Sequence, residues 1–424
     1  MSTDVIKYSP MGWNSWDCYG DMVNEEQLLG NAEYMRDNLK EFGWEYVVCD
    51  IQWSEPGATG HHYRNFTELC MDEYSRLIPA ENRFPSSAGG KGFKPIADKI
   101  HAMGLKFGIH IMRGIPRQAV HRNTPIMCDG VTARDIAHPF SVCPWNCDMY
   151  GVDYRKKGAQ EYYNSLFQLY AQWGVDYVKC DDIANTEFKP QEPYSAREEI
   201  EMLHKAIENC GRSIVLSLSP GPAPVWEHEH LSQHAELWRM SGDFWDDWDK
   251  LLKMFDLCKA WAPYVKDGAY PDCDMLPVGR LEKCNNKPEG RWTRFTQDEQ
   301  ITMLSLWCIF RSPLMIGAEM RENDEFTLKL LTNKAILEMN KKSRNATELC
   351  RTESYIIWSA DCVDGGKYYA IFNLDDKEQE LTIDGIDDSF PITELWTGES
   401  FSAKQSKIKA VVNSHGAKVF KINE

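Results

Sequence analysis

The 424-residue chain has no apolar run of the length that spans a bilayer, and it is short of positive charge. A membrane helix needs about 20 consecutive apolar residues. Lys and Arg total 47 against 64 Asp and Glu, which gives a net charge of -17. Because an acidic protein is repelled by phosphates and by anionic lipids, we expect neither nucleic acid nor membrane as a partner.

The chain also lacks a compact cysteine framework and a recognisable secretory leader. Its 14 Cys are spread along the chain, and Cys49, Cys180 and Cys308 lie in apolar runs. A free Cys in such a run behaves as a small hydrophobe. The first ten residues contain no charged stretch followed by an apolar one. We therefore predict a cytoplasmic protein, with a trimmed signal peptide as the alternative.

The sequence also lacks His, Cys, Asp or Glu residues at the spacing typical of a metal site. The segment Glu227–His230 and the pair His61 and His62 suggest ligands at first sight. Their spacing fits no tight zinc signature, so we interpret them as solvated loop residues. We expect no metal and no organic cofactor.

Apolar and aromatic side chains are abundant. Hydrophobic residues make up 43% of the chain and aromatic residues 12%, with 15 Trp. This is enough for a sizeable core, and the length favours more than one domain. Most Trp side chains are expected to be buried, and exposed ones to offer flat faces to sugar rings.

Strand-like apolar runs alternate with helix-like segments over the first three quarters of the chain, which predicts an α/β protein with a parallel sheet. The runs are Met11–Trp16, Tyr46–Trp53, Leu105–Met112, Val175–Asp182, Ser213–Ser219, Glu236–Asp243, Tyr270–Gly279 and Ser312–Gly317. Eight such units predict a (β/α)8 TIM barrel over residues 1–335. Beyond it, short alternating runs separated by Asp, Gly and Asn turns predict an antiparallel β-sandwich over residues 336–424.

Two of the predicted barrel strands end in charged residues of the kind found in active sites. The run Val175–Asp182 closes with Lys179 and Asp181, and the run Glu236–Asp243 closes with Arg239 and Asp243. The carboxyl ends of barrel strands carry the catalytic groups in this fold. Two Asp on separate strand ends, each beside a cation, are typical of a glycoside hydrolase.

Further motifs extend this pattern over nearly the whole chain. They are Met11–Trp16, Arg83–Pro85, Gly104–Ile109, Tyr177–Asp181, Trp238–Asp243, Asp272–Leu276, Arg311–Gly317 and Leu395–Gly398. Taken in this order, they resemble glycoside hydrolase family 27. The resemblance implies a barrel followed by an antiparallel β domain, a retaining mechanism, and no metal or organic cofactor. Members of that family include α-galactosidases and α-N-acetylgalactosaminidases.

The resemblance assigns Asp181 as the nucleophile and Asp243 as the acid/base. Lys179 lies on the same strand face as Asp181, and its cation should favour the ionised carboxylate. A general acid must hold its proton, so we expect Phe244 and Trp245 to desolvate Asp243. Arg239 is expected to hold substrate hydroxyls or to orient carboxylates. For retention the two carboxyl groups should lie about 5–5.5 Å apart.

Two further residues match the sugar-binding positions of the family. Trp16 corresponds to a tryptophan that stacks on the sugar, with core packing as the alternative. Asp50 corresponds to the first of two adjacent Asp that bind galactose around its O4 and O6 hydroxyls.

The second of those Asp is replaced here by Ile51. An isoleucine accepts no hydrogen bond, and burying an unpaired hydroxyl costs about 1–3 kcal/mol. A sugar that keeps the ring stereochemistry of galactose but lacks its CH₂OH group is L-arabinopyranose. The resemblance therefore extends to the β-L-arabinopyranosidases of the family. A neutral substitution in a galactosidase is the competing interpretation.

Three other positions depart from the family pattern. His110 stands where the third strand usually ends in Tyr, and we expect it to keep a hydrogen-bonding role. Ser219 replaces a Glu near O2 of the sugar, as in N-acetylgalactosaminidases, although Ile51 opposes any hexose with a free O6. Ile183 stands at the usual position of a disulfide Cys, and that loss suits a reducing compartment.

The sequence therefore predicts a retaining exo-glycosidase that releases terminal β-L-arabinopyranose from a small carbohydrate substrate. An α-galactosidase or α-N-acetylgalactosaminidase is the first alternative. A non-catalytic sugar-binding protein is the second, and a binder would not need both Asp181 and Asp243. The residues leave open whether the chain forms a homo-oligomer.

Overall fold

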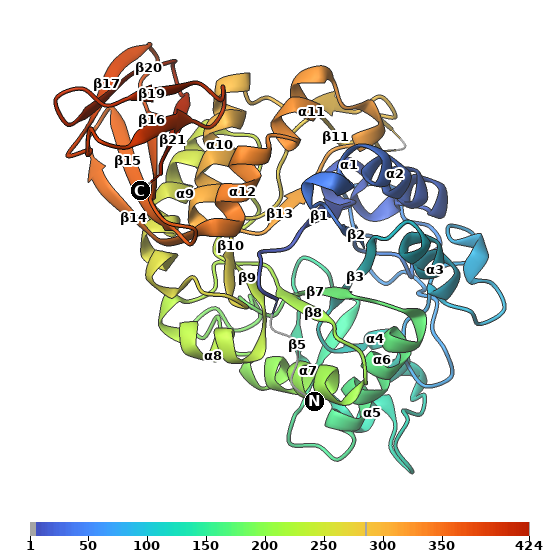
Figure 1. The fold of residues 1–424 in the computed structure, drawn as a ribbon. Helices are drawn as coiled ribbons and strands as arrows, with labels where there is room; N and C mark the ends of the chain where they lie inside the picture. The colour runs from blue at the N-terminus through green and yellow to red at the C-terminus, as the bar shows by residue number, and fades with distance from the viewer. Residues whose placement is uncertain (1–5, 285, 424) are drawn as a thin grey trace.

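The computed structural model describes residues 6–284 and 286–423, and its first part is a barrel of parallel strands (Figure 1). The strand order is β10-β9-β8-β7-β3-β2-β1-β13. The strands are β1 (Met11–Asn14), β2 (Tyr46–Cys49), β3 (Lys106–Met112), β7 (Tyr177–Asp181), β8 (Val215–Leu218), β9 (Leu237–Arg239), β10 (Tyr270–Asp272) and β13 (Leu314–Ile316). A parallel bridge from Leu276 to Ile316 joins the end after β10 to β13. The predicted barrel is confirmed, and each predicted run contains an observed strand.

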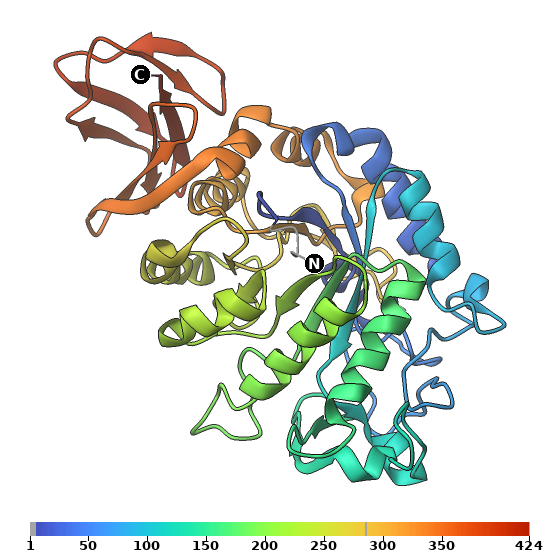
Figure 2. The ribbon, with the colours of Figure 1, turned by 60° about the horizontal axis from the view of Figure 1, so that its bottom comes forward.

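Helices connect these strands and surround them (Figure 2). The longer ones are α2 (Glu25–Asn38), α3 (Lys94–Ala102), α6 (Ala159–Trp173), α7 (Arg197–Asn209), α9 (Trp248–Trp261), α10 (Gln297–Phe310) and α12 (Lys334–Lys342). The shorter ones are α1 (Trp16–Tyr19), α4 (Arg117–Arg122), α5 (Ala133–Ile136), α8 (His228–His234) and α11 (Glu325–Leu331). Helix α2 begins at a capping box formed by Asn24 and Gln27, and α10 at one formed by Thr296 and Glu299. These boxes fix where the two helices start, because each satisfies free N–H groups of the first turn. Among the described residues, no helix is long and apolar enough to cross a membrane.

Two small sheets are inserted in the barrel loops. The first is antiparallel, with the order β4-β6-β5, and it consists of β4 (Ile115–Pro116), β5 (Ala137–Val142) and β6 (Met149–Val152). The second pairs β11 (Arg280–Leu281) with β12 (Arg291–Trp292). Neither was predicted from the sequence. Both lie on the side of the barrel where the strands have their carboxyl ends, since β4 follows β3 and β11 follows β10.

The C-terminal part is antiparallel, as predicted. Its main sheet has the order β14-β15-β16-β21-β18-β19, and β17 pairs with β20. The strands are β14 (Ser343–Arg351), β15 (Tyr355–Cys362), β16 (Lys367–Asn373), β17 (Gln379–Asp384), β18 (Pro391–Glu394), β19 (Ser400–Ser402), β20 (Lys407–Val412) and β21 (Ala417–Ile422). The boundary predicted at residues 335/336 falls in the first turn of α12, and the first antiparallel strand begins at Ser343.

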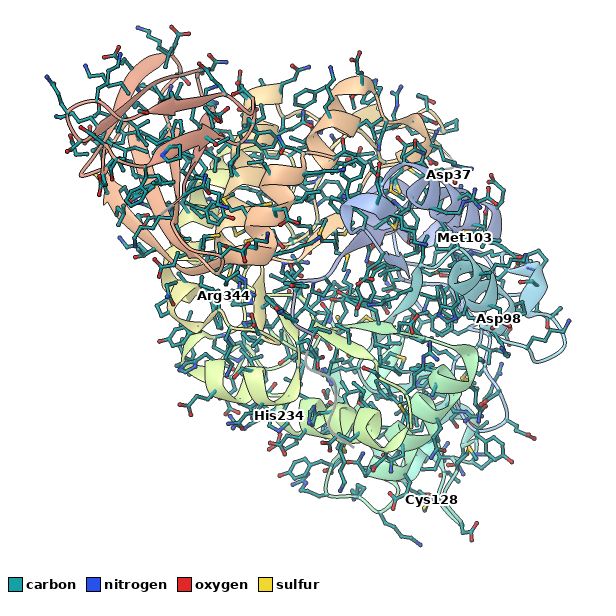
Figure 3. The ribbon with its side chains drawn as sticks, in the orientation of Figure 1. Asp37, Asp98, Met103, Cys128, His234 and Arg344 are labelled. Atoms are coloured by element: carbon teal, nitrogen blue, oxygen red, sulfur yellow. The ribbon has the colours of Figure 1, made fainter. Side chains whose placement is uncertain are left out.

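The two parts share one apolar core. Trp358 and Phe372 of the sheet belong to the same buried cluster as Phe255 of α9, and the rings of Phe255 and Phe372 lie 4.9 Å apart. Helix α10 is buried on almost every side because it lies between the barrel and the sheet. An ion pair of 3.0 Å between Arg344 and Asp267 also joins the parts, at the junction where Figure 3 labels Arg344.

Candidate active site

A cavity of about 300 Å³ opens at the carboxyl ends of the barrel strands. Seven of the nine predicted site residues line it, namely Trp16, Asp50, Lys179, Asp181, Ser219, Arg239 and Asp243. They come from the ends of β1, β2, β7, β8 and β9 or from the residues directly after them. The barrel therefore brings together side chains that are far apart in the sequence.

Lys179 connects two carboxylates on one side of this cavity. Its Nζ lies 3.0 Å from Oδ2 of Asp50 and 3.7 Å from Oδ2 of Asp181. Asn14 donates a second hydrogen bond of 2.7 Å to Asp50. Burial opposes the charge on Lys179, but the two carboxylates outweigh it and raise the pKa of Lys179. The lysine is thus a fixed cation between Asp50 and Asp181.

Asp181 is buried and held in its ionised form. Burial alone would raise its pKa, but the Lys179 cation and the hydrogen bond from His110 lower it below its ordinary value. Nε2 of His110 lies 2.7 Å from Oδ2 of Asp181, and the Ser219 hydroxyl also bonds this carboxylate. An ionised carboxylate with these three partners is suited to attack an electrophilic carbon.

Asp243 has a different environment. Its side chain is 64% exposed, whereas that of Asp181 is 11% exposed. We expected Phe244 and Trp245 to desolvate Asp243, and this is wrong for Phe244, which packs against Phe295 and Trp307. The reason is that Phe244 points into the core while Asp243 stays at the rim. A bound substrate would therefore have to shield the Asp243 carboxyl group from water.

Arg239 holds the loop that carries Asp243. Its guanidinium lies 3.2 Å from Oδ1 of Asp243 and 2.7 Å from Oδ2 of Asp274. It also donates a hydrogen bond of 2.7 Å to the carbonyl of Gly242. Asp274 in turn accepts the backbone N–H of Phe244 at 2.8 Å. Arg239 therefore orients a carboxylate, which is one of the two roles that the sequence predicted.

Ile51 and His110, the other two predicted residues, do not line the main cavity. Both line a smaller neighbouring cavity of about 30 Å³. Ile51 is buried in an apolar cluster with Met112 and Met149, and Trp16 packs against that cluster. The two residues therefore lie one layer behind the wall, His110 against Asp181 and Ile51 against the aromatic side.

Several residues of the cavity were missed by the sequence analysis. Tyr63 and Trp145 form an aromatic wall with Trp16, with centroids 5.7 Å apart from Trp16 to Tyr63 and again from Tyr63 to Trp145. Asp17 and Asp274 also line the cavity. Asp274 lies in the segment Asp272–Leu276, whose match to the family pattern could have identified it. Tyr63 and Trp145 lie in irregular loops that give no periodic signal.

Asp17 is a buried carboxyl group whose Oδ2 has no hydrogen-bond partner among the residues that the structure describes. Burial, followed by the charge of Asp274, raises the pKa of Asp17 well above its ordinary value. Burial therefore favours the protonated form of this group, and that form can donate its proton to a hydroxyl oxygen in the cavity.

A buried ionic network lies behind Asp181. Arg113, at the end of β3, pairs with Asp182 at 2.8 Å and with Glu199 of α7 at 2.9 Å. Tyr163 of α6 donates a hydrogen bond of 2.5 Å to Glu199. The network ties β3, β7, α6 and α7 together and fixes the backbone next to the candidate nucleophile.

The described residues contain no group of three or more His, Cys, Asp or Glu that could hold a metal ion. All 14 Cys are free. The closest thiols are those of Cys258 and Cys273, with 3.6 Å between their sulfur atoms.

Known glycosidases are similar to this chain over nearly its whole length. The family model described as alpha galactosidase A matches residues 147–342, and that of the alpha galactosidase C-terminal beta sandwich domain matches residues 352–422. A crystal structure of a family 27 β-L-arabinopyranosidase from Geobacillus stearothermophilus is 52% identical, with a TM-score of 0.94 and coverage of 99% of this chain and 97% of that one. A variant of that enzyme was solved in complex with arabinose and is 51% identical, with the same TM-score and coverage. Alpha-galactosidase 2 of Arabidopsis thaliana is 25% identical over 99% of this chain and 90% of its own length.

Proposed function

This chain belongs to glycoside hydrolase family 27, and we propose that it is a retaining exo-glycosidase that releases terminal β-L-arabinopyranose. The observation that carries the sugar assignment is the apolar cluster at Ile51, directly after Asp50. Both oxygens of Asp50 are already engaged, Oδ1 by the backbone N–H of Ile51 and Oδ2 by Asn14 and Lys179.

A galactoside would carry a CH₂OH group where the arabinoside has hydrogen. Next to Asp50 that group would lie toward the apolar cluster of Ile51, Met112 and Met149, where the side chain of residue 51 offers no acceptor for its hydroxyl. Burying an unpaired hydroxyl is unfavourable by about 1–3 kcal/mol. The relative that is 52% identical and is described as a β-L-arabinopyranosidase supports the same choice.

In the first chemical step the Asp181 carboxylate attacks the anomeric carbon. The bond from that carbon to the leaving oxygen breaks, and Asp243 gives its proton to this oxygen. The product is a glycosyl ester on Asp181. His110, Lys179 and Ser219 keep the attacking carboxylate ionised and fixed in position.

In the second step Asp243, now a carboxylate, takes a proton from water. The water oxygen attacks the anomeric carbon, the ester bond to Asp181 breaks, and arabinose leaves with its original configuration. The exposure of Asp243 suits this exchange, because water reaches the group once the leaving group has departed.

We further propose a cytoplasmic location, since 14 free Cys suit a reducing compartment. Substrates would then enter the cell as short arabinose-bearing oligosaccharides.

The first experiment compares kcat/KM on p-nitrophenyl β-L-arabinopyranoside and p-nitrophenyl α-D-galactopyranoside. We expect the arabinoside to be preferred by at least about tenfold, the usual worth of one misplaced group in a pocket. A preference for the galactoside would instead make the protein an α-galactosidase. No turnover of either substrate, with full binding of the free sugar, would favour a sugar-binding protein.

A further inference from the structure

A second, larger cavity of about 610 Å³ lies beside the site already described. Trp245 lines both cavities. The imidazole of His61, from the second cavity, lies edge-on to Trp16 at 5.3 Å and to Trp245 at 6.3 Å. The two cavities therefore meet along an aromatic border at the rim of the barrel.

The second cavity is assembled from three loops. The loop after β2 contributes His61 and His62, the loop after β9 contributes Trp245, and the segment after β11 contributes Glu282 and Lys287. Each loop leaves the barrel on the side where catalytic groups gather. The cavity is therefore positioned by the same elements as the active site.

Its position fits the path of a leaving group. Asp243 protonates the leaving oxygen in the proposed reaction, and Trp245 follows on the same loop. The leaving group must therefore pass Asp243, which is exposed at the rim. On the opposite side, Asp50 and Lys179 line the part of the cavity that would hold the released sugar.

The lining of the second cavity is polar and carries charges of both signs. Glu282 lies 2.9 Å from Arg291 and 3.4 Å from Lys287. These groups, with His62, offer both donors and acceptors, and Trp245 offers one aromatic face. A ring with many hydroxyl groups matches such a lining. A large apolar aglycone would displace water from these charged groups and give them no hydrogen bond in return, which is unfavourable.

We propose that the second cavity binds the neutral sugar residue to which the terminal arabinose is linked. Trp245 provides the stacking face, and Glu282 and Lys287 bind hydroxyl groups. The natural substrate is then an oligosaccharide, and not the glycoside of a small or apolar alcohol. This inference rests on the proposed glycosidase function and adds the class of its aglycone.

The test compares two substrates with the same terminal sugar. One is p-nitrophenyl β-L-arabinopyranoside, and the other is a disaccharide in which β-L-arabinopyranose is linked to a neutral pentose or hexose. In Lys287→Ala and Glu282→Gln we expect kcat/KM on the disaccharide to fall about three- to tenfold more than on the aryl glycoside, the worth of one hydrogen bond. The matched control is Lys91→Ala, an exposed lysine that lines neither cavity.

Equal losses on both substrates, or no loss on either, would overturn the second sugar site. Circular dichroism of each variant separates these results from misfolding. The sugar specificity is tested separately, because the same ratio can be measured with an aryl α-galactoside and an α-galactosyl disaccharide. If only the galactosides are cleaved and the variants still lose the disaccharide selectively, the sugar assignment fails and the second site stands.

Discussion

Nε2 of His110 lies 2.7 Å from Oδ2 of Asp181, and both groups are buried on the neighbouring strands β3 and β7. Because Asp181 is held ionised and can only accept, the hydrogen bond requires a proton on Nε2 of the imidazole. His110 therefore fixes the orientation of the attacking carboxylate from behind.

The first prediction concerns this hydrogen bond. His110→Ala removes one donor to the ionised Asp181, and bonds to charged groups are worth about 1.5–3 kcal/mol. We expect kcat/KM on the preferred aryl glycoside to fall about 10- to 100-fold. The matched control is His121→Ala, since His121 is exposed in α4. Unchanged kinetics in His110→Ala would show that Lys179 and Ser219 position the nucleophile without it.

The second prediction concerns pH. The cation of Lys179 lowers the pKa of Asp181, so the carboxylate stays ionised at low pH. Lys179→Met removes that cation, and the pKa of Asp181 should rise. Activity that depends on ionised Asp181 is lost as pH falls through its pKa, so the acid limb of kcat/KM should move upward by about one pH unit or more. A pH profile of the wild type and the variant measures the shift. If the acid limb does not move, it reports the titration of a group other than Asp181.

Much of the fold could be predicted because burial leaves a direct trace in the sequence. The strands of a barrel are buried on both faces, so Tyr46–Cys49 and Leu314–Ile316 appear as continuous apolar runs. Their ends were harder to predict. The run Glu236–Asp243 continues in apolar and small residues, but the strand ends at Arg239, where the chain turns into the rim.

The sequence also singled out the two Asp of the proposed mechanism, since Asp181 ends β7 beside Lys179 and Asp243 follows β9 beside Arg239. Tyr63 and Trp145 could not be predicted, because only tertiary structure brings their loops over the cavity. The same holds for the layer behind the wall. The sequence predicted a hydrogen-bonding role for His110 and an apolar wall at Ile51, but not that both side chains lie behind the wall of the main cavity.

The third prediction concerns stability. Arg113 is fully buried, and its removal leaves Asp182 and Glu199 without their counter-charge. Breaking a buried pair in this way costs about 3–5 kcal/mol, so Arg113→Met should lower the free energy of unfolding by that amount. Arg36→Met is the control, because Arg36 pairs with Asp37 at a site where both side chains are exposed, and such a pair is worth about 0–1 kcal/mol. Urea denaturation of both variants measures the difference, and equal losses would mean that the network adds no stability.

The last prediction concerns the sugar itself. Ile51→Asp places a carboxylate next to Asp50 and gives a CH₂OH group an acceptor. We expect the ratio of kcat/KM on the α-galactoside to that on the β-L-arabinopyranoside to rise by at least about tenfold. Ile51→Leu is the matched control, because it keeps the site apolar and should leave the ratio close to that of the wild type.

The position of Ile51 makes this a demanding test. The side chain lies behind the cavity wall and packs with Met112 and Met149, so a carboxylate there must turn toward the cavity to act on substrate. Thermal denaturation will show whether the folded fraction is unchanged, so that the ratio reports selectivity alone. A folded Ile51→Asp variant with the wild-type ratio would mean that residue 51 does not determine the preference between the two sugars. The preference would then depend on the aromatic wall of Trp16, Tyr63 and Trp145.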